Sequence, residues 1–309
     1  MQIKLRHLST FIEVARGSSV GKAADILNVS QPAVTRTIRE LEEAIGVALL
    51  EKDGRGIKLT SAGEEFRRHA GASIAALRQG VDAIRLGQTH AATPLRIGAL
   101  PTVSARIMPA AVRSFLAASQ GSRLKIVTGE NAVLLDQLAA GELDLVVGRL
   151  AAPERMLGLT FEHLYSEQVL FVVRPGHPLL AAQPFDLSQL AGFTVLMPTA
   201  SAIIRPFVDR FLIAHGLPDT QARIETVSDA FGRAFLRDSD AVWIISEGVV
   251  ANDVAAGHLA VLPVDTAETR GAVGLTMRAD AERPLPLAML ITAIRAAAAA
   301  VRNDHARDG

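Results

Sequence analysis

The stretch VGKAADILNVSQPAVTRTIRELEE, residues 20–43, constrains the fold most, because it predicts two short helices joined by a tight turn. Ser30 is a suitable N-cap for the second helix, and Pro32 fits its first turn, where a missing N–H costs nothing. The apolar residues of that helix recur at helical spacing and form one buried stripe: Val34, Ile38, Leu41 and Ile45.

The opposite face of the second helix is polar and cationic. Arginine can pair bidentately with guanine, and threonine can contact a base or a phosphate. Such a face on the second of two helices is what a helix-turn-helix needs to enter a major groove. The candidate DNA contacts are therefore Ser30, Gln31, Pro32, Thr35, Arg36 and Arg39. Taken alone, the stretch also fits an ordinary helical hairpin with a solvated charged face.

Both flanks supply the remaining parts of a winged helix-turn-helix. Residues 5–16 predict an amphipathic helix that closes the core. The segment LLEKDGRGIKLT, residues 49–60, predicts a two-stranded wing, and its tip residue Arg55 could reach a phosphate or a minor groove. A surface hairpin with one unrelated arginine is the alternative interpretation.

Residues 61 to about 88 contain no proline and predict one long helix with a heptad-like apolar seam. Such a stripe needs a partner, and a two-stranded coiled coil between two copies would provide one. Ser73 and Gly80 weaken the seam, so packing against the chain's own domains stays open as an alternative.

The motif AAxxLxVSQPAVTRxIRxLE and a wing ending in GRGIKLTSAG resemble the LysR-type transcriptional regulators across residues 5–66. Leu50 and Lys52 stand where that family usually has Phe and Arg, which affects packing and one phosphate contact. The resemblance implies a homodimer or homotetramer that binds double-stranded DNA. RNA polymerase is a further candidate partner.

Length and composition agree with such a regulator. A chain of 309 residues suggests two or three domains. Residues 1–90 carry 13 basic and 10 acidic side chains, whereas the whole chain has no net charge. There is no cysteine, the N-terminus has no apolar signal segment, and the apolar run near the C-terminus is interrupted by Arg295. We expect a cytoplasmic protein that does not span a membrane.

Beyond a short linker at residues 90–94, strands alternate with helices, which indicates parallel sheets covered on both faces. The predicted strands are residues 95–99, 125–128, 143–148, 168–174, 193–197, 223–227, 240–246 and 273–277. The predicted helices are residues 105–117, 131–140, 203–215 and 285–301. They form two similar α/β units in series.

In LysR-type regulators such units resemble periplasmic solute-binding proteins and are crossed by two hinge strands. The resemblance thus implies an α/β protein with a winged helix-turn-helix at residues 1–60 and a dimerising helix at 61–90. Effector subdomain I would comprise residues 94–165 and 267–303, and subdomain II residues 166–266.

Two similar loops follow predicted strands and open helices: LPTVSARIMP at 100–109 and MPTASAIIRP at 197–206. Ligands of open α/β sheets bind beyond the carboxyl ends of strands, where helix N-termini favour anions. The candidate effector contacts are Thr102, Ser104, Thr128, Arg149, Thr199 and Ser201. Each hydroxyl residue taken singly could instead be an N-cap, and Arg149 could form a structural pair with Asp144 or Glu142.

The segment KIVTGENAVLLDQLAAGELDLVVGRLAAP, followed by FEHLYSE, resembles the LysR-type branch that controls protocatechuate breakdown, with sugar-uptake regulators nearby. That branch implies an acid effector such as a carboxymuconate, and the alternative is a sugar-uptake regulator with a neutral ligand. A metabolic enzyme is a remote alternative. The eight histidines show no metal-ligand spacing, and GxSxG and phosphate-loop motifs are absent, so we expect no catalytic residue, cofactor or metal.

Overall fold

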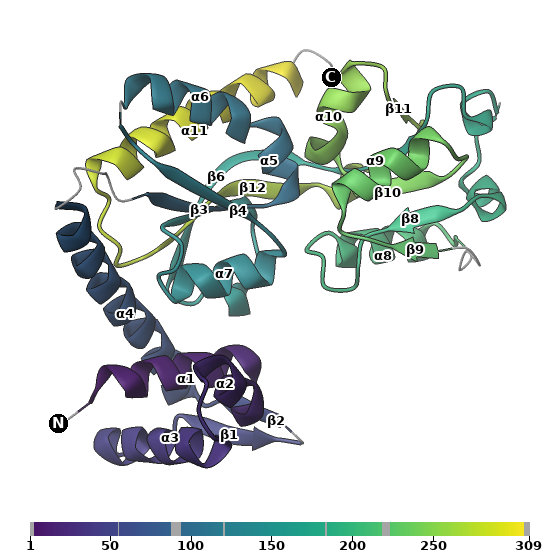
Figure 1. The fold of residues 1–309 in the computed structure, drawn as a ribbon. Helices are drawn as coiled ribbons and strands as arrows, with labels where there is room; N and C mark the ends of the chain where they lie inside the picture. The colour runs from purple at the N-terminus through teal and green to yellow at the C-terminus, as the bar shows by residue number, and fades with distance from the viewer. Residues whose placement is uncertain are drawn as a thin grey trace.

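The computed structural model describes residues 3–54, 56–87, 94–119, 121–182, 184–217 and 223–305. A small N-terminal domain is followed by a long helix that leads to two α/β units lying side by side (Figure 1). This is the predicted α/β architecture with an N-terminal winged helix-turn-helix.

The N-terminal domain packs three helices around a small apolar core. These are α1 (Leu5–Gly17), α2 (Val20–Leu27) and α3 (Gln31–Ile45). Phe11, Val14 and Leu41 are fully buried between them. Asn28 ends α2 in the left-handed conformation, with φ of 52°, which asparagine tolerates better than most residues. The turn between α2 and α3 is therefore tight, and the two helices form a helix-turn-helix.

The predicted wing is present as two antiparallel strands, β1 (Leu50–Asp53) and β2 (Gly56–Leu59). The chain enters the turn between them at Gly54, whose φ of +57° suits glycine. Arg55, the expected contact at the wing tip, lies outside the described residues.

The predicted long helix is also present, as α4 (Ser61–Gly87). Its first half packs on the N-terminal domain through Ala70 and Ile74, which are buried. Its second half exposes apolar side chains of the seam, including Leu77 and Ile84. The coiled coil between two copies stays a prediction.

The first α/β unit contains a five-stranded sheet in the order β4-β3-β5-β12-β6. Its strands are β3 (Leu95–Ala99), β4 (Leu124–Thr128), β5 (Leu145–Arg149), β6 (Leu159–Glu167) and β12 (Gly271–Arg278). Helices α6 (Met108–Ala118) and α11 (Leu285–His305) cover one face, and α7 (Asn131–Ala139) lies on the face towards the N-terminal domain (Figure 1).

The second unit contains a five-stranded sheet in the order β11-β7-β10-β8-β9. Its strands are β7 (Val169–Val173), β8 (Val195–Met197), β9 (Arg223–Glu225), β10 (Val242–Ser246) and β11 (Ala260–Val261). Its α-helices are α8 (Arg205–Ala214), α9 (Asp229–Arg237) and α10 (Glu247–Ala255). Short 3-10 turns lie at Pro153–Arg155, Pro178–Leu180, Leu187–Gly192 and Ala267–Thr269.

The expected parallel pairing is confirmed for only part of each sheet, because both sheets also contain antiparallel pairs. β3 pairs in parallel with β4 and β5, but β12 runs antiparallel to both β5 and β6. The cause is the chain path. β6 leads from the first unit directly into β7 of the second, and β12 brings the chain back, so these two crossing strands run in opposite directions.

One predicted helix is divided in two. Instead of a single helix over residues 105–117, the chain forms α5 (Pro101–Arg106) and α6, which meet at Ile107. A proline within a helix lacks the N–H that would bond one turn back, so it is placed best in a first turn. Pro101 and Pro109 each lie in the first turn of one of the two helices.

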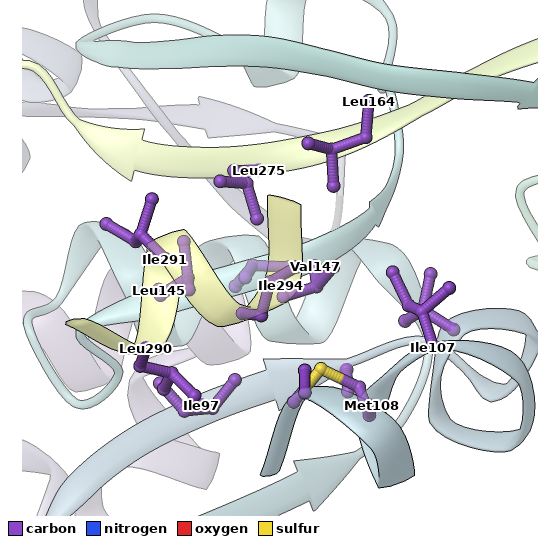
Figure 2. Packing of buried hydrophobic residues seen from close by; sticks show 14 of the residues in the cluster. Ile97, Ile107, Met108, Leu145, Val147, Leu164, Leu275, Leu290, Ile291 and Ile294 are labelled. Atoms are coloured by element: carbon purple, nitrogen blue, oxygen red, sulfur yellow. The ribbon is translucent and has the colours of Figure 1, made fainter. Parts of the chain in front are cut away.

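α11 is, among the described residues, the helix long and apolar enough by composition to cross a membrane. Its residues Leu290, Ile291 and Ile294 are buried in the core of the first unit, together with Leu145 and Leu275 (Figure 2). This packing identifies α11 as a core helix, in agreement with the sequence prediction.

Candidate functional site

The N-terminal domain presents the polar face of α3 outward. Val34, Ile38 and Leu41 are buried as predicted, which turns the opposite side of the helix to the surface. Five of the candidate DNA contacts line one shallow surface groove: Gln31, Pro32, Thr35, Arg36 and Arg39. Ser30 lies just before them, and its hydroxyl accepts a hydrogen bond from the Ala33 N–H at 3.4 Å as the N-cap.

An acidic residue, Glu40, organises this face in the free protein. The Arg36 Nε donates to Glu40 Oε1 at 3.0 Å, and Arg6 Nη2 donates to Glu40 Oε2 at 3.0 Å. The Arg36 guanidinium, followed by that of Arg6, lowers the pKa of Glu40. The Arg36 side chain is nevertheless 82% exposed, so it is accessible to an incoming phosphate or base.

A pocket of about 560 Å³ lies between the two α/β units at the strand ends. The first unit contributes Thr102, Ser104, Thr128 and Arg149 to its lining, all of them predicted effector contacts. The second unit contributes residues at or after the ends of β8, β9 and β10, among them Ile203, Thr226 and Ser246. The four candidates of the first unit therefore lie in one pocket.

Thr199 and Ser201 are not part of the described lining. The loop that contains them turns before α8 begins at Arg205, so neither residue lies in the first turn of that helix. Ser201 instead reaches across to the first unit, where its Oγ donates to Glu130 Oε1 at 2.7 Å. Thr199 Oγ1 lies 3.3 Å from Ser201 Oγ.

Arg149 lies at the buried side of the pocket and is 3% exposed. Its Nη2 donates to two backbone carbonyls of the crossing segments, Glu167 O at 2.8 Å and Thr269 O at 3.2 Å. Its Nε lies 3.6 Å from Glu167 Oε1, so the two side chains form an ion pair. The partner is neither Asp144 nor Glu142, because these pair with Arg96 and Arg16.

Glu167 is held by further donors from both units. Its Oε2 accepts from Thr102 Oγ1 at 2.5 Å and from the Gly248 N–H at 3.3 Å. Burial raises the pKa of the Glu167 carboxyl, although Arg149 opposes this effect. Burial also lowers the pKa of Arg149.

Sequence reasoning missed several residues of the pocket. Asn131 begins α7 in the lining, is 5% exposed, and its Oδ1 has no hydrogen-bond partner among the described residues. It follows β4 by three residues, so the same strand-end rule could have found it. Asp229 also lines the pocket, and burial raises the pKa of its carboxyl. Glu167, which pairs with Arg149 but is not part of the lining, gave no signal, because β6 was not predicted as a strand.

Within the described residues, no group of three or more His, Cys, Asp or Glu side chains could hold a metal ion. A helix-turn-helix face joined to two α/β units with a pocket between them defines a DNA-binding regulator that responds to a small molecule.

Comparison with known proteins gives the family. Residues 88–299 match the LysR substrate binding domain, and residues 5–64 match the bacterial regulatory helix-turn-helix protein of the lysR family. The chain belongs to the LysR family of transcriptional regulators, which are not enzymes.

One relative in particular is similar over the whole length. The chain is 63% identical to the HTH-type transcriptional regulator PcaQ of Agrobacterium fabrum over 297 residues, covering 96% of each chain. A full-length OxyR variant from Pseudomonas aeruginosa shares the fold, with a TM-score of 0.60, 23% identity and coverage of 96% and 95%. Full-length CbnR complexed with its target DNA matches with a TM-score of 0.52, 22% identity and coverage of 96% and 100%.

Proposed function

We propose that this regulator controls an operon for the breakdown of an aromatic acid, protocatechuate, and that its effector is a small carboxylate. The proposal is supported by the 63% identity to PcaQ and by the resemblance to the protocatechuate branch. As a DNA-binding protein it acts in the cytoplasm, as a homodimer or homotetramer, and RNA polymerase is a candidate partner. Its DNA contacts are those of the α3 face.

One observation supports a carboxylate as the class of effector. Arg149 Nη1 belongs to a residue of the pocket lining, is buried, and has no hydrogen-bond partner among the described residues, whereas Nε faces Glu167 Oε1 at 3.6 Å. An unsatisfied buried N–H is costly, and a carboxylate oxygen is the acceptor that best satisfies a guanidinium. A carboxylate entering the pocket would therefore accept from Arg149, with the Thr102 hydroxyl and the Asn131 side chain as neighbouring polar groups.

A neutral sugar is the second candidate, favoured by the acids Glu130 and Asp229 in the same lining. Their oxygens could accept from sugar hydroxyls and would repel a polyanion. Two features reduce that repulsion. Ser201 already donates to Glu130, and burial raises the pKa of the Asp229 carboxyl. The carboxylate therefore remains the better match.

Calorimetry on the full-length protein discriminates between the two classes. We expect carboxymuconate to bind, and Asn131→Ala to weaken binding by about 1 kcal/mol or more because a pocket hydrogen bond is lost. Asn303→Ala, at an exposed asparagine of α11, serves as the matched control and should bind as the wild type. Heat from galactose or glucose, with none from any carboxylate, would refute the acid effector and favour the sugar.

A further inference from the structure

Helix α7 extends from the effector pocket to the DNA-binding domain. Asn131, at its start, lines the pocket, whereas Ala139, at its end, contacts α4. Nine residues at the α-helical rise span about 13 Å. Figure 1 shows α7 on the face of the first sheet that is turned towards the N-terminal domain.

The contact between α7 and α4 is close and depends on a glycine. A Cβ on residue 71 would overlap the carbonyl oxygen of Ala139 and lie 2.9 Å from Ala140 Cα. Ala140 also belongs to the apolar cluster of the DNA-binding domain, together with Ala70 and Ile74. The end of α7 is thus packed into the DNA-binding domain of the same chain.

Two ion pairs flank this packing. Arg67 Nη1 of α4 donates to Asp136 Oδ1 of α7 at 3.2 Å. Arg16 Nη2 of α1 donates to Glu142 Oε1, just beyond α7, at 2.8 Å. Their side chains are between 25% and 36% exposed, so water can replace each partner at little cost. Such ion pairs fix the orientation of the DNA-binding domain relative to α7, and they can still be broken and replaced by others.

The other end of α7 is linked to the second α/β unit. Ser201 of that unit donates to Glu130, the residue immediately before Asn131, at 2.7 Å. A change in the angle between the two units must therefore either break this hydrogen bond or displace the first turn of α7. Because a short helix moves as a rigid body, a displacement at its first turn reaches its last turn.

We propose that α7 transmits the state of the effector pocket to the DNA-binding domain through the α7–α4 contact and the Arg16–Glu142 ion pair just beyond α7, within one chain. The inference rests on the proposed function, because it requires an effector that changes DNA binding. It assigns to Gly71, Arg16 and Arg67 a role in the response that is separate from effector binding and from DNA contact.

Two glycines of α4 provide a matched test in the full-length protein. Gly71→Ala forces α4 and α7 apart, whereas a Cβ on residue 80 meets nothing within 4 Å. We expect Gly71→Ala to bind carboxymuconate as the wild type does, yet to lose the effector-induced change in operator affinity, about fivefold or more. Gly80→Ala should keep that change.

A charge exchange gives an independent test. Arg16→Glu places like charges opposite Glu142 and should reduce the effector response, and Arg16→Glu combined with Glu142→Arg should restore it. Arg210→Glu, at an exposed arginine of α8, is the control for charge alone. Binding of carboxymuconate by Arg16→Glu with wild-type affinity, together with a reduced response, separates a role in the response from a merely structural role.

The inference is overturned if Gly71→Ala and Arg16→Glu respond to carboxymuconate as strongly as their controls. If the wild type binds no carboxylate, the proposed effector class fails, and hydrogen exchange of the effector-free protein decides the α7 contact. Faster exchange in the last turn of α7 for Gly71→Ala than for Gly80→Ala supports the contact. Equal exchange in the two variants overturns it.

Discussion

At the scale of single residues, Arg36 and Arg39 give α3 its cationic outer face. Arg36 is held by Glu40 in the free protein, whereas Arg39 has no ion pair among the described residues. We expect Arg39→Ala to weaken operator binding by roughly 1–3 kcal/mol if it contacts a base, and to relax specificity at that position.

The measurement for Arg39 is a titration of a mapped operator at fixed salt concentration. Arg210→Ala, at an exposed arginine of the second α/β unit, is the control. Operator affinity equal to wild type in Arg39→Ala and also in Arg36→Ala would remove α3 from the DNA interface.

The buried carboxyl of Glu167 gives a prediction for pH. Its pKa in the folded protein is raised above the ordinary 4.5 by burial, so the folded state binds this proton more tightly than the unfolded state does. Stability from this group is fully present below pH 4.5 and is lost as the pH rises through the raised pKa. Glu167→Gln removes this effect.

The free energy of unfolding of Glu167→Gln relative to wild type should therefore increase as the pH rises from 4.5 through the raised pKa. Urea denaturation at several pH values checks this. A relative stability that is constant over the range would show that the carboxyl does not titrate there.

The residues of the pocket were partly predictable. Thr102 and Ser104 follow β3, and Thr128 and Arg149 end β4 and β5, so the strand-end rule placed all four in the pocket. The partner of Arg149 was not predictable, because Glu167 ends a crossing strand 18 residues further on, which only the tertiary fold brings close. The hydrogen bond from Ser201 to Glu130 of the other unit could not be predicted for the same reason.

At the scale of elements, periodicity identified α3, α4, α11 and most strands. β6 was not predicted, because its sequence, LTFEHLYSE, mixes charged and apolar residues without a clean alternation. α10 was not predicted, because it begins at Glu247, directly after β10 ends at Ser246, and no loop separates the two elements. The antiparallel direction of some strands was not predicted, because it depends on where the chain crosses between the two units.

α11 provides a stability prediction for the core of the first unit. Ile294 is fully buried, whereas Leu285 on the same helix is 73% exposed. We expect Ile294→Ala to lower the free energy of unfolding by about 2–5 kcal/mol, because it removes buried methyl groups and leaves a cavity. Leu285→Ala should change it little, and equal losses by chemical denaturation would contradict the packing.

At the scale of the whole molecule, the second half of α4 leaves an apolar stripe uncovered. Leu77 is 49% exposed, Val81 39% and Ile84 71%. A second copy of α4 would cover this stripe, so sedimentation at micromolar concentration should show a dimer or a tetramer. Leu77→Glu combined with Ile84→Glu should shift the protein towards monomer and abolish tight binding to paired half-sites. A wild-type monomer would exclude this assembly.

A carboxylate bound between the two units is expected to change how the protein binds its operator. The direct test is the operator dissociation constant of the full-length protein with and without carboxymuconate, for wild type and for Arg149→Met combined with Glu167→Gln. This double variant avoids leaving one buried charge unpaired. We predict a change of about fivefold or more in the wild type and none in the variant. An operator affinity that carboxymuconate leaves unchanged in the wild type, or changes equally in the variant, would contradict the claim.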